Sequence, residues 1–559
     1  MTGGASENGD SAFFTHRSLM PVGKAKPVTI QTATERAALK KSLTIATAIM
    51  MASVFLSRII GLVREQVIAG FGGTSTTIDA YVTAFFIPEL LNHFLAGGFL
   101  AITFIPIFQR HLAQSDEEGA WRAFSNIITI GSIAFAIIIP VSIIFAPDIL
   151  RLMGPHIANA QTLPMTVRLT RIILPAQMFF YWGAFFSAVQ MARHRFFLPA
   201  LAPLFYNGGI ILGGLLLGRR FGVEGFAWGV LIGAFAANVL VQLPGAMKAG
   251  LRFRFRFDLA DPDLKKFILL SAPVILGLGM TFSNEIFFRF FGSFLGEGGT
   301  SSINYALRTM GFVVAVFGQA SGVAFYPYLS RLAAERNFRE ITSLVNKVLA
   351  RIAGYCIPLS LLLAVLAPQV ISVLYEHGHF THASTLRTAP AFALYMVGAF
   401  AFSAAVFVVR PFYAIQRPYI PMIVSSIVTV LTLPLYYVTS RAWGASGIAA
   451  SATAGMVVQF ITLYVIWYRR YADKHSIGPL LKTLGTIVAI SLIGAATGWG
   501  VKHEMLRVHF TPVRILNNLI VGVGTAIPTG IVVMALYEIT GIQKIRELVG
   551  RLMKRGQTV

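Results

Sequence analysis

Charged residues and cysteine are both scarce in this chain, and each scarcity excludes a class of protein. Charged side chains make up 12% of the 559 residues and hydrophobic ones 55%, and the mean hydropathy is +0.70. Soluble domains carry about a quarter charged residues, so this composition predicts a membrane protein. The single cysteine, Cys356, excludes a disulfide framework or a cysteine-based zinc site within one chain. We expect it to fill apolar space in a helix.

Motifs of nucleotide binding and catalysis are also missing. The sequence has no Gly-rich phosphate loop ending in Gly-Lys-Ser or Gly-Lys-Thr, which excludes ATP as the direct energy source. Asp261-Pro262-Asp263 could be the acidic pair of a metal-using glycosyltransferase, but an aspartate before proline is more simply a helix N-cap. His377, His379 and His382 have tolerable metal spacing, yet a solvated loop explains them more simply. We therefore expect no enzyme activity, cofactor or bound metal.

Apolar stretches long enough to cross a bilayer, about 20 residues each, recur along the whole chain. They predict an all-α integral membrane protein with fourteen transmembrane helices, near residues 42–63, 79–105, 123–146, 165–188, 199–218, 224–245, 268–294, 303–327, 346–367, 389–409, 418–439, 446–468, 479–500 and 515–538. The stretch 79–105 contains Pro88, Gly97, Gly98 and Pro106, which predict a broken or bent segment. Such a break is tolerated in a membrane only where the backbone faces protein or water.

The net charge of +23 is unevenly distributed, and its distribution predicts the orientation of the chain. Of the 46 Lys and Arg, 31 fall on segments expected in the cytoplasm if the N-terminus is inside, against 11 on external segments. The positive-inside rule then places both termini in the cytoplasm. The first 41 residues are polar, which predicts a disordered tail without a cleaved signal peptide. The alternating Arg and Phe of 252–256 predict a segment near anionic lipid heads, so we expect no nucleic-acid partner.

Short motifs recur along the chain at an offset of 221 or 222 residues. The four matched pairs are Phe104-Ile-Pro106 with Phe325-Tyr-Pro327, Ala146-Pro147 with Ala367-Pro368, Arg195-x-x-x-Pro199 with Arg417-x-x-x-Pro421, and Gly222-x-x-Gly225 with Gly444-x-x-Gly447. Transporters are commonly built from such duplicated halves, with the substrate site between them. Six helices separate the copies, so the halves share one orientation in the membrane. The predicted organisation is a tail (1–41), an N-lobe (42–257), a C-lobe (258–470), two extra helices (471–540) and a basic tail (541–559).

Ionisable residues stand inside several predicted helices, where each costs roughly 2.5–3.5 kcal/mol at the helix centre. Arg58 and Arg64 end the first helix, Glu285 and Arg289 lie on the seventh, and Arg308 lies on the eighth. The alternatives to ligand contact are snorkelling of the first two and a local Glu285–Arg289 ion pair. Arginines outnumber carboxylates at the inner ends of the two related lobes. This excess of positive charge predicts a cavity for an anion. The planar guanidinium fork suits phosphate in particular.

Three motifs resemble a known family. They are Ser57-Arg58-x-x-Gly61-x-x-Arg64, Asp79-Ala80-x-x-x-Ala84-Phe85-x-x-Pro88 and Phe104-x-Pro106. They are similar to the MurJ (MviN) family of lipid II flippases, within the multidrug/oligosaccharidyl-lipid/polysaccharide exporter superfamily. The segment Leu374-Tyr375-x-x-Gly378-x-Phe380-Thr381 and the Arg308 region also resemble that family. The resemblance runs from about residue 42 to 540.

The resemblance implies a cationic central cavity that opens alternately to the two sides of the bacterial inner membrane. It would carry undecaprenyl-pyrophosphate-linked peptidoglycan precursor, lipid II, from the cytoplasmic to the periplasmic leaflet. The family's essential cavity arginines fall on Arg58, Arg64 and Arg308, and its cavity aspartate falls on Asp79. The last two helices would form a groove for the lipid tail. The partners implied are a lipid-linked glycan precursor and membrane lipids, and we expect a monomer.

The chain also departs from the family pattern at charged positions. Many members have an Arg pair followed by Glu on the second helix, where this chain has Asn92, His93 and Gly97. Many have a glutamate where this chain has Gly311. Glu285 and Arg289 are then candidates to replace the missing charges. The predicted substrate-binding set is Arg58, Arg64, Asp79, Asn92, His93, Glu285, Arg289 and Arg308.

These departures leave other functions open. Within transport, the chain could carry another polyprenyl-linked oligosaccharide, such as an exopolysaccharide or O-antigen unit, or act as a drug/cation antiporter. An antiporter would favour carboxylates over an arginine cluster. A membrane scaffold without transport activity would not need the arginines. A membrane transferase would need an acidic metal motif, for which only the Asp261 pair is available.

Overall fold

The computed structural model describes residues 33–93, 99–153, 157, 159, 161–281, 283–472 and 477–542, and these residues form helices and no strand. The first half contains α1 (Ala33–Gly72), α2 (Thr76–Ala84), α3 (Phe86–Leu91), α4 (Phe99–Ala113), α5 (Glu117–Arg151), α6 (Thr162–Ile173), α7 (Ala176–Ala192), α8 (Phe197–Phe221), α9 (Glu224–Phe235), the π-helix η2 (Ala236–Leu240) and α10 (Gln242–Lys248). The second half contains α11 (Pro262–Thr281), α12 (Ser283–Gly292), α13 (Gly299–Val314), the π-helix η3 (Ala315–Gln319), α14 (Ala320–Ala334), α15 (Phe338–Val365), α16 (Ala367–Tyr375), α17 (His382–Ala414), α18 (Tyr419–Tyr471), α19 (Ile477–Leu506) and α20 (Arg514–Thr540). The expectation of an all-α fold is confirmed.

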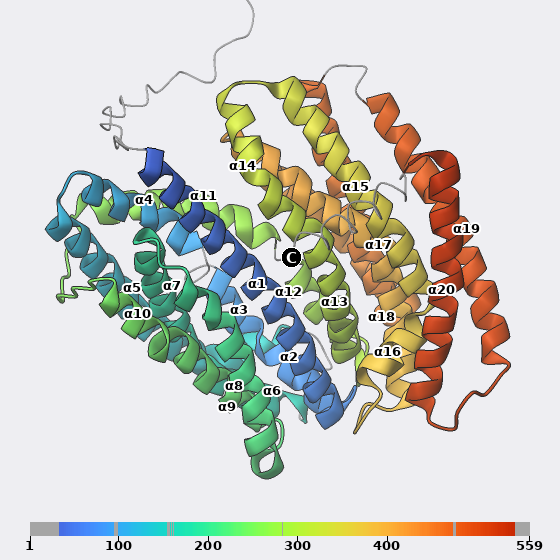
Figure 1. Cartoon of the computed structure of the whole chain (residues 1–559). Helices are drawn as coiled ribbons and strands as arrows, with labels where there is room; N and C mark the ends of the chain where they lie inside the picture. Colours follow the sequence, from blue (N-terminus) through green and yellow to red (C-terminus); the bar gives the residue numbers. More distant parts are fainter. Residues whose placement is uncertain are drawn as a thin grey trace, which may run out of the picture.

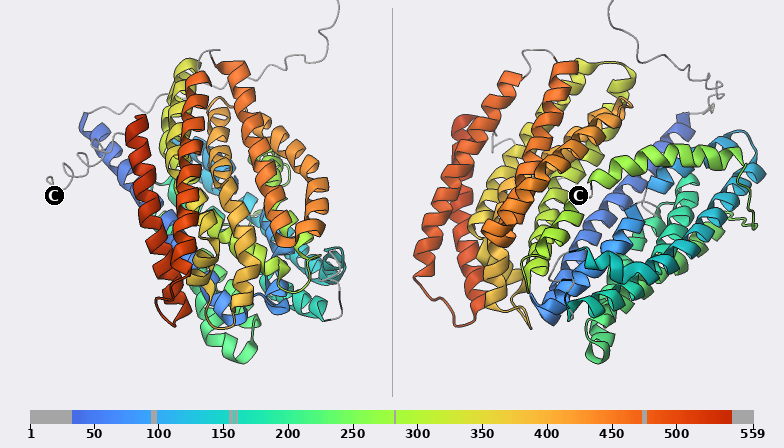
Figure 2. Two further views of the ribbon diagram at one scale, coloured as in Figure 1. Left: turned by 90° about the vertical axis from the view of Figure 1, so that its right-hand side faces the viewer. Right: turned by 180° about the vertical axis from the view of Figure 1, so that it is seen from behind.

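Two bundles stand side by side in Figure 1, with α1 along the boundary between them. The bundle on the left is built from α2 to α10, and the one on the right from α13 to α18. Helices α19 and α20 lie together at the outer edge of the second bundle, and the two rotated views in Figure 2 agree. This arrangement places α1 where its side chains can meet those of α13.

Many helices carry apolar side chains on their outer faces. Within the described residues, nine helical segments are long and apolar enough to cross a membrane. Leu216, Leu269 and Ile539 are between 72% and 80% exposed, which is unfavourable in water and favourable against lipid chains. The chain is therefore a multi-pass membrane protein. The number of fourteen spans remains a prediction.

Helix boundaries differ from the sequence prediction at several places. Helix α1 begins at Ala33, within the segment 1–41 that the sequence assigned to the tail, and the tail boundary remains a prediction. The predicted helix 79–105 is broken, as expected, into α2, α3 and α4, and Gly97 and Gly98 fall outside the described residues. The predicted helices 418–439 and 446–468 both lie in α18, which turns sharply at Gly444.

Left-handed backbone positions recur at the same offset as the sequence motifs. Ser115 and Arg336 have φ of 59° and 54°, and His194 and Gln416 have φ of 59° and 58°. Residues with a side chain rarely adopt this conformation, so a matched pair is informative. Gly222 and Gly444, which also match at an offset of 222, have φ of 62° and 57°. The turns between helices are thus duplicated, and the lobe boundaries with their superposition remain predictions.

Helix N-caps repeat in the same way. Asp116 accepts a hydrogen bond from the Gly119 N–H at the start of α5. Asn337, which lies 221 residues later, accepts one from the Glu340 N–H at the start of α15. Each cap satisfies a backbone donor that the first helical turn leaves unpaired. The hydrogen bond from Gly119, followed by one from His111, holds the pKa of the Asp116 carboxyl below its ordinary value.

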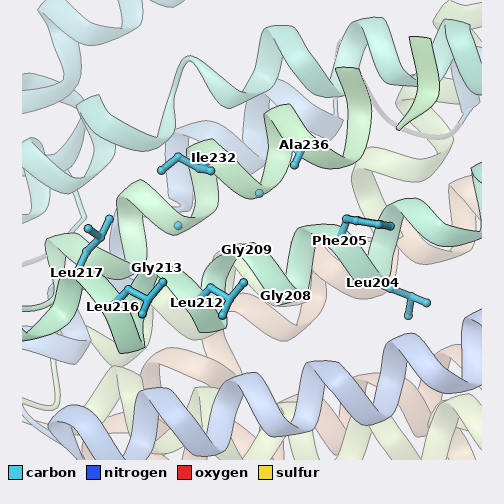
Figure 3. Close-up of a pocket in the computed structure, with 12 residues that line it drawn as sticks. Leu204, Phe205, Gly208, Gly209, Leu212, Gly213, Leu216, Leu217, Ile232 and Ala236 are labelled. Atoms are coloured by element: carbon cyan, nitrogen blue, oxygen red, sulfur yellow. The ribbon is translucent and has the colours of Figure 1, made fainter. Parts of the chain in front are cut away.

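Glycines bring α8 and α9 into backbone contact. A Cβ atom at Gly213 would lie 2.4 Å from the Gly229 Cα, and one at Gly209 would lie 2.3 Å from the Gly233 Cα. Only residues without a side chain allow this approach. Beside the contact lies a hollow of about 590 Å³, lined by apolar residues such as Leu212 and by the same glycines (Figure 3).

Several predictions about single residues can be compared with the structure. Asp261 is an N-cap, as expected, because its Oδ1 accepts from the N–H groups of Asp263 and Leu264 at the start of α11. Cys356 is fully buried, which confirms its role as a filler. The side chains of Phe253, Phe255 and Phe257 are more than half exposed. Exposed rings beside arginines are consistent with a segment at the membrane interface.

Candidate functional site

Charged side chains from both bundles meet along α1. The contributing helices are α1, α3, α12 and α13. Four arginines and three glutamates take part, namely Arg58, Arg64, Arg289, Arg308, Glu65, Glu89 and Glu285. We call this set the central charge cluster. The pairing within it decides which arginines are available to a ligand.

Arg64 is committed to protein partners. Its Nη2 lies 2.5 Å from the Glu65 Oε1, and its Nη1 donates to the Asn207 Oδ1 at 2.9 Å. Glu65 is 4% exposed, and its second oxygen accepts from the Asn304 Nδ2 at 3.2 Å. The pair therefore links α8, α1 and α13. A snorkelling role for Arg64 does not fit this geometry.

Arg289 also forms an ion pair within the protein, but its partner is not Glu285, which the sequence suggested. Its guanidinium forms a two-pronged pair with Glu89, at 2.6 and 2.9 Å, and its Nε donates to the Val82 carbonyl at 3.1 Å. The side chain is 2% exposed. The alternative of a local ion pair with the Glu285 carboxylate is wrong, because a glutamate 200 residues away takes its place. A buried pair of this geometry ties the two bundles together.

Arg308 and Glu285 form the loosest pair of the cluster. Their closest atoms are 3.5 Å apart, and the two side chains are 33% and 28% exposed. The Arg308 Nε is buried and has no hydrogen-bond partner among the described residues. A guanidinium held this weakly can exchange its carboxylate for another anion.

Arg58 has no carboxylate partner in the part of the chain that the structure describes. Its Nη2 donates to the neutral Gln319 Oε1 at 3.1 Å, and the side chain is exposed. The charge of Arg308 is close enough to repel both Arg58 and Arg64. Four arginines against three glutamates leave one uncompensated positive charge, and it resides on Arg58. An anion placed between Arg58 and Arg308 would relieve this repulsion.

Asp79 connects α2 to the start of α13 through backbone hydrogen bonds. It is fully buried, and its two oxygens accept the backbone N–H groups of Gly298 and Ser301, each at 2.7 Å. These donors lie at the N-terminus of α13, where unpaired N–H groups favour an anion. Asp79 thus joins α2 to α13. The expectation that it orients an arginine or a sugar hydroxyl has no counterpart in these two contacts.

Two of the positions that depart from the family pattern, Asn92 and His93, lie within one helical turn of Glu89. His93 Nδ1 lies 2.6 Å from the Glu89 carbonyl, and the Asn92 N–H is bonded within the same turn. Gly97 is outside the described residues. A Cβ added at Gly311 would have no atom within 4 Å. The missing acidic side chain therefore leaves open space beside α13 rather than a packed contact.

One end of α1 is sealed against the second bundle by contacts that sequence reasoning missed. The Gly70 carbonyl accepts the His379 N–H at 2.9 Å, the Gln66 carbonyl lies 3.0 Å from the His377 Nε2, and Thr74 donates to Ser384 at 2.8 Å. We call these contacts the α1 seal. The seal includes the loop 376–381, in which His377 and His379 are exposed, as expected for a solvated loop, and also contact α1. Within the described residues, no group of three or more His, Cys, Asp or Glu could hold a metal ion.

Two glycines make the α1 seal possible. Gly73 and Gly378 both have φ of 58°, a left-handed conformation that favours glycine. A Cβ at Gly378 would lie 2.2 Å from the Gly70 carbonyl oxygen, and one at Gly73 would lie 2.3 Å from the His379 oxygen. The only signal in the sequence was the glycine content of these segments, which does not identify their partner.

Comparisons with known proteins agree on one family. The family model described as lipid II flippase MurJ matches residues 68–517. A lipid II flippase MurJ of Burkholderia cenocepacia is 28% identical over 449 residues, covering 79% of this chain and 86% of its own length. A probable lipid II flippase MurJ of Bdellovibrio bacteriovorus is 27% identical over 482 residues, covering 82% and 90%.

Solved structures show the same fold. A lipid II flippase MurJ in an inward closed conformation has a TM-score of 0.73 at 22% identity, over 89% of this chain and 99% of that one. An inward-facing multidrug resistance transporter of the MATE family, within the MOP superfamily, has a TM-score of 0.63 at 16% identity, over 78% and 99%. At these identities the likeness concerns the fold alone.

Proposed function

The chain belongs to the lipid II flippase MurJ family, and we propose that it moves lipid II across the membrane by alternating access. It is then a transporter and not an enzyme. The observation that carries this proposal is the central charge cluster, in which Arg58 lacks a carboxylate and Arg308 holds one weakly. A pyrophosphate crossing an apolar membrane needs such groups, because an unescorted diphosphate loses its hydration.

The cluster suggests how the headgroup is held. The pyrophosphate would take two-pronged hydrogen bonds from Arg58 and Arg308 and displace Glu285 from its 3.5 Å contact. Arg64 and Arg289 would hold α1, α3 and α12 in place and shape the site without direct contact in this state. Asp79 would close α2 onto α13, and Asn92 and His93 would line the approach beside Glu89. Glu285 would return to Arg308 on release, so that the empty carrier does not leave Arg308 without a carboxylate.

The α1 seal suggests the state of the cycle. We place both termini in the cytoplasm from the charge asymmetry of the sequence. The sealed end of α1 is its C-terminal end, which then faces the periplasm. The carrier in this state would load from the cytoplasmic side and release after the seal opens. The lobes 42–257 and 258–470 would move against one another during that step.

Complementation tests the substrate directly. The chain should restore growth and normal shape to a bacterium depleted of its own lipid II flippase, and purified protein in vesicles should translocate labelled lipid II. Failure of both, with normal membrane abundance and with translocation of another polyprenyl-linked oligosaccharide, would replace lipid II by that glycan. Transport of cationic drugs alone would contradict the anion site itself.

Glu285→Gln is expected to tighten substrate binding and slow turnover. The substitution removes the carboxylate that competes for Arg308, so lipid II should bind roughly tenfold more tightly and leave more slowly. Binding to protein in nanodiscs and flipping in vesicles measure the two effects. Glu297→Gln is the matched control, since it removes an exposed acid outside the cluster. Weaker binding in Glu285→Gln would show that Glu285 holds the substrate instead of competing with it.

Fusions to alkaline phosphatase test the orientation. The enzyme is active only outside the cytoplasm, so fusions after residue 260 should be inactive and fusions after residue 380 active. The physical reason is the excess of Lys and Arg on the loops expected inside. Activity at the first site, or its absence at the second, would reverse the assignment and move the α1 seal to the cytoplasmic face.

A further inference from the structure

A second arginine site lies between helices of the first bundle and shares no residue with the central charge cluster. A hollow of about 680 Å³ opens between α6 and α9. Arg168 and Arg171 of α6 line one wall, and Glu224 and Trp228 of α9 line the other. None of these residues enters the proposed transport step. We call this hollow the α6–α9 hollow.

Arg171 is held in place by a defect in α5. Pro147 lacks an N–H, so the Ile143 carbonyl one turn earlier has no partner within its own helix. The Arg171 Nε donates to this carbonyl at 3.1 Å. That bond uses one of the five guanidinium donors. Neither Nη of Arg171 has an acceptor among the described residues.

The two arginines of the hollow differ in their charge balance. Arg168 Nε lies 2.9 Å from the Glu224 Oε1, so this pair carries no net charge. Arg171 has no carboxylate partner in the described part of the chain. The α6–α9 hollow therefore has a net charge of +1, and Arg171 carries it.

The position of Arg171 makes an isolated charge costly. Ile144 and Phe145 of α5 are 64% and 53% exposed beside it, as side chains that face lipid would be. The Ile143 carbonyl lies five residues before Asp148, the first charged residue at this end of α5, which is about 7.5 Å along the helix. Near this boundary of the apolar layer a guanidinium loses part of its hydration, which costs free energy. An anion in the hollow would remove most of that cost.

We propose that the α6–α9 hollow binds the phosphate of an anionic phospholipid headgroup. The planar Nη pair of Arg171 suits two phosphate oxygens, and one net positive charge matches a singly charged phosphodiester. Trp228 is 40% exposed, and an indole at this level prefers the boundary between headgroups and acyl chains. Phe221 and Ile172 give the first acyl carbons an apolar wall. The hollow between α8 and α9 has no charged lining residue, and we assign no headgroup to it (Figure 3).

Arg171→Gln is the variant that tests this site. The glutamine amide can still donate to the Ile143 carbonyl, so the fold should be kept while the charge is lost. Purified full-length protein would be titrated with phosphatidylglycerol, with zwitterionic phosphatidylethanolamine and with inorganic phosphate, following thermal stability and bound lipid by native mass spectrometry. We expect phosphatidylglycerol alone to bind and stabilise the parent protein. Its apparent affinity should fall about tenfold in Arg171→Gln.

Two controls separate this site from general attraction to a basic protein. Arg219→Gln removes another exposed arginine at the same end of the first bundle and should leave the affinity unchanged. Arg168→Gln with Glu224→Gln removes the neutral pair and should have a small effect. Equal loss in Arg171→Gln and Arg219→Gln, or no loss in either, would overturn the proposal. Equal stabilisation by inorganic phosphate would show a free-anion site instead.

A crosslink keeps the test independent of the stability of Arg171→Gln. A photoreactive phenylalanine at Trp228 should label phosphatidylglycerol in preference to phosphatidylethanolamine in mixed vesicles. No preference between the two lipids would contradict the headgroup assignment. Lipid II transport is measured separately by complementation. Failure of the phospholipid site can therefore be distinguished from failure of the proposed transport function.

Discussion

Alanine in place of Arg58 or Arg308 is expected to abolish rescue of a flippase-depleted strain while leaving the protein at normal abundance in the membrane. Each substitution removes a charged contact to the pyrophosphate worth roughly 1.5–3 kcal/mol, which corresponds to about a ten- to hundredfold loss of substrate binding. Neither arginine is tightly bound to the protein, so the fold should tolerate its loss. Lysine should restore activity poorly, because a point charge cannot reproduce the two-pronged contact.

The remaining arginines provide the controls for this result. Arg331→Ala removes an arginine that is 69% exposed and forms only a surface pair with Glu335, at 3.6 Å, so full rescue is expected. Arg289→Ala should reduce the amount of folded protein, because it leaves Glu89 in a buried site without its partner. Full activity of both Arg58→Ala and Arg308→Ala would refute the anion site. Loss of abundance in these two variants would assign them a structural role like that of Arg289.

Valine in place of Gly378 is expected to open the α1 seal and to stop transport. The new side chain would collide with the Gly70 carbonyl and would force a β-branched residue into the left-handed region. Thr74 is 9% exposed in the sealed state and can report the opening once changed to cysteine. Labelling of that cysteine by a membrane-impermeant maleimide should rise several-fold. Cys356 is buried and should contribute little background.

Gly222→Val is the matched control for the seal. Gly222 has φ of 62°, so valine meets the same backbone penalty there. A Cβ at Gly222 has no atom within 4 Å, and the residue lies at the turn between α8 and α9, outside the seal. Labelling of the reporter cysteine should stay low in this variant. Equal labelling in both variants would mean that general destabilisation, and not the seal, controls access to Thr74.

The seal and the central charge cluster together describe a carrier with one closed end and a loosely held counter-ion. Arg289 and Arg64 fasten the helices, whereas Arg58 and Arg308 remain open to exchange. The exposure of each arginine and the distance to its carboxylate partner decide whether it has a structural role or can bind substrate. Exposed, long contacts give up their partner at low cost, and buried two-pronged contacts do not.

Some of these features were determined by the sequence alone. Composition and apolar stretches were enough for the membrane class and the all-α fold, because crossing a bilayer requires satisfied backbone groups over about 20 residues. The offset of 221 or 222 was visible in motifs, and the turns at Ser115 and Arg336 repeat it in the backbone. The N-cap at Asp261 was also predictable, since capping depends on residues only two or three positions away.

Only the tertiary structure decided which charges meet. Sequence spacing offered Glu285 to Arg289, but Arg289 binds Glu89, which lies 200 residues away on α3. Asp79 caps α13 across a separation of 219 residues, and the loop at His377 packs on α1 across more than 300. Local periodicity specifies helices and their faces and carries no information on which helix a face will meet. An arginine binds whichever carboxylate the packing brings within reach. Whether it forms a structural ion pair or can bind substrate is therefore decided only when the two bundles pack together.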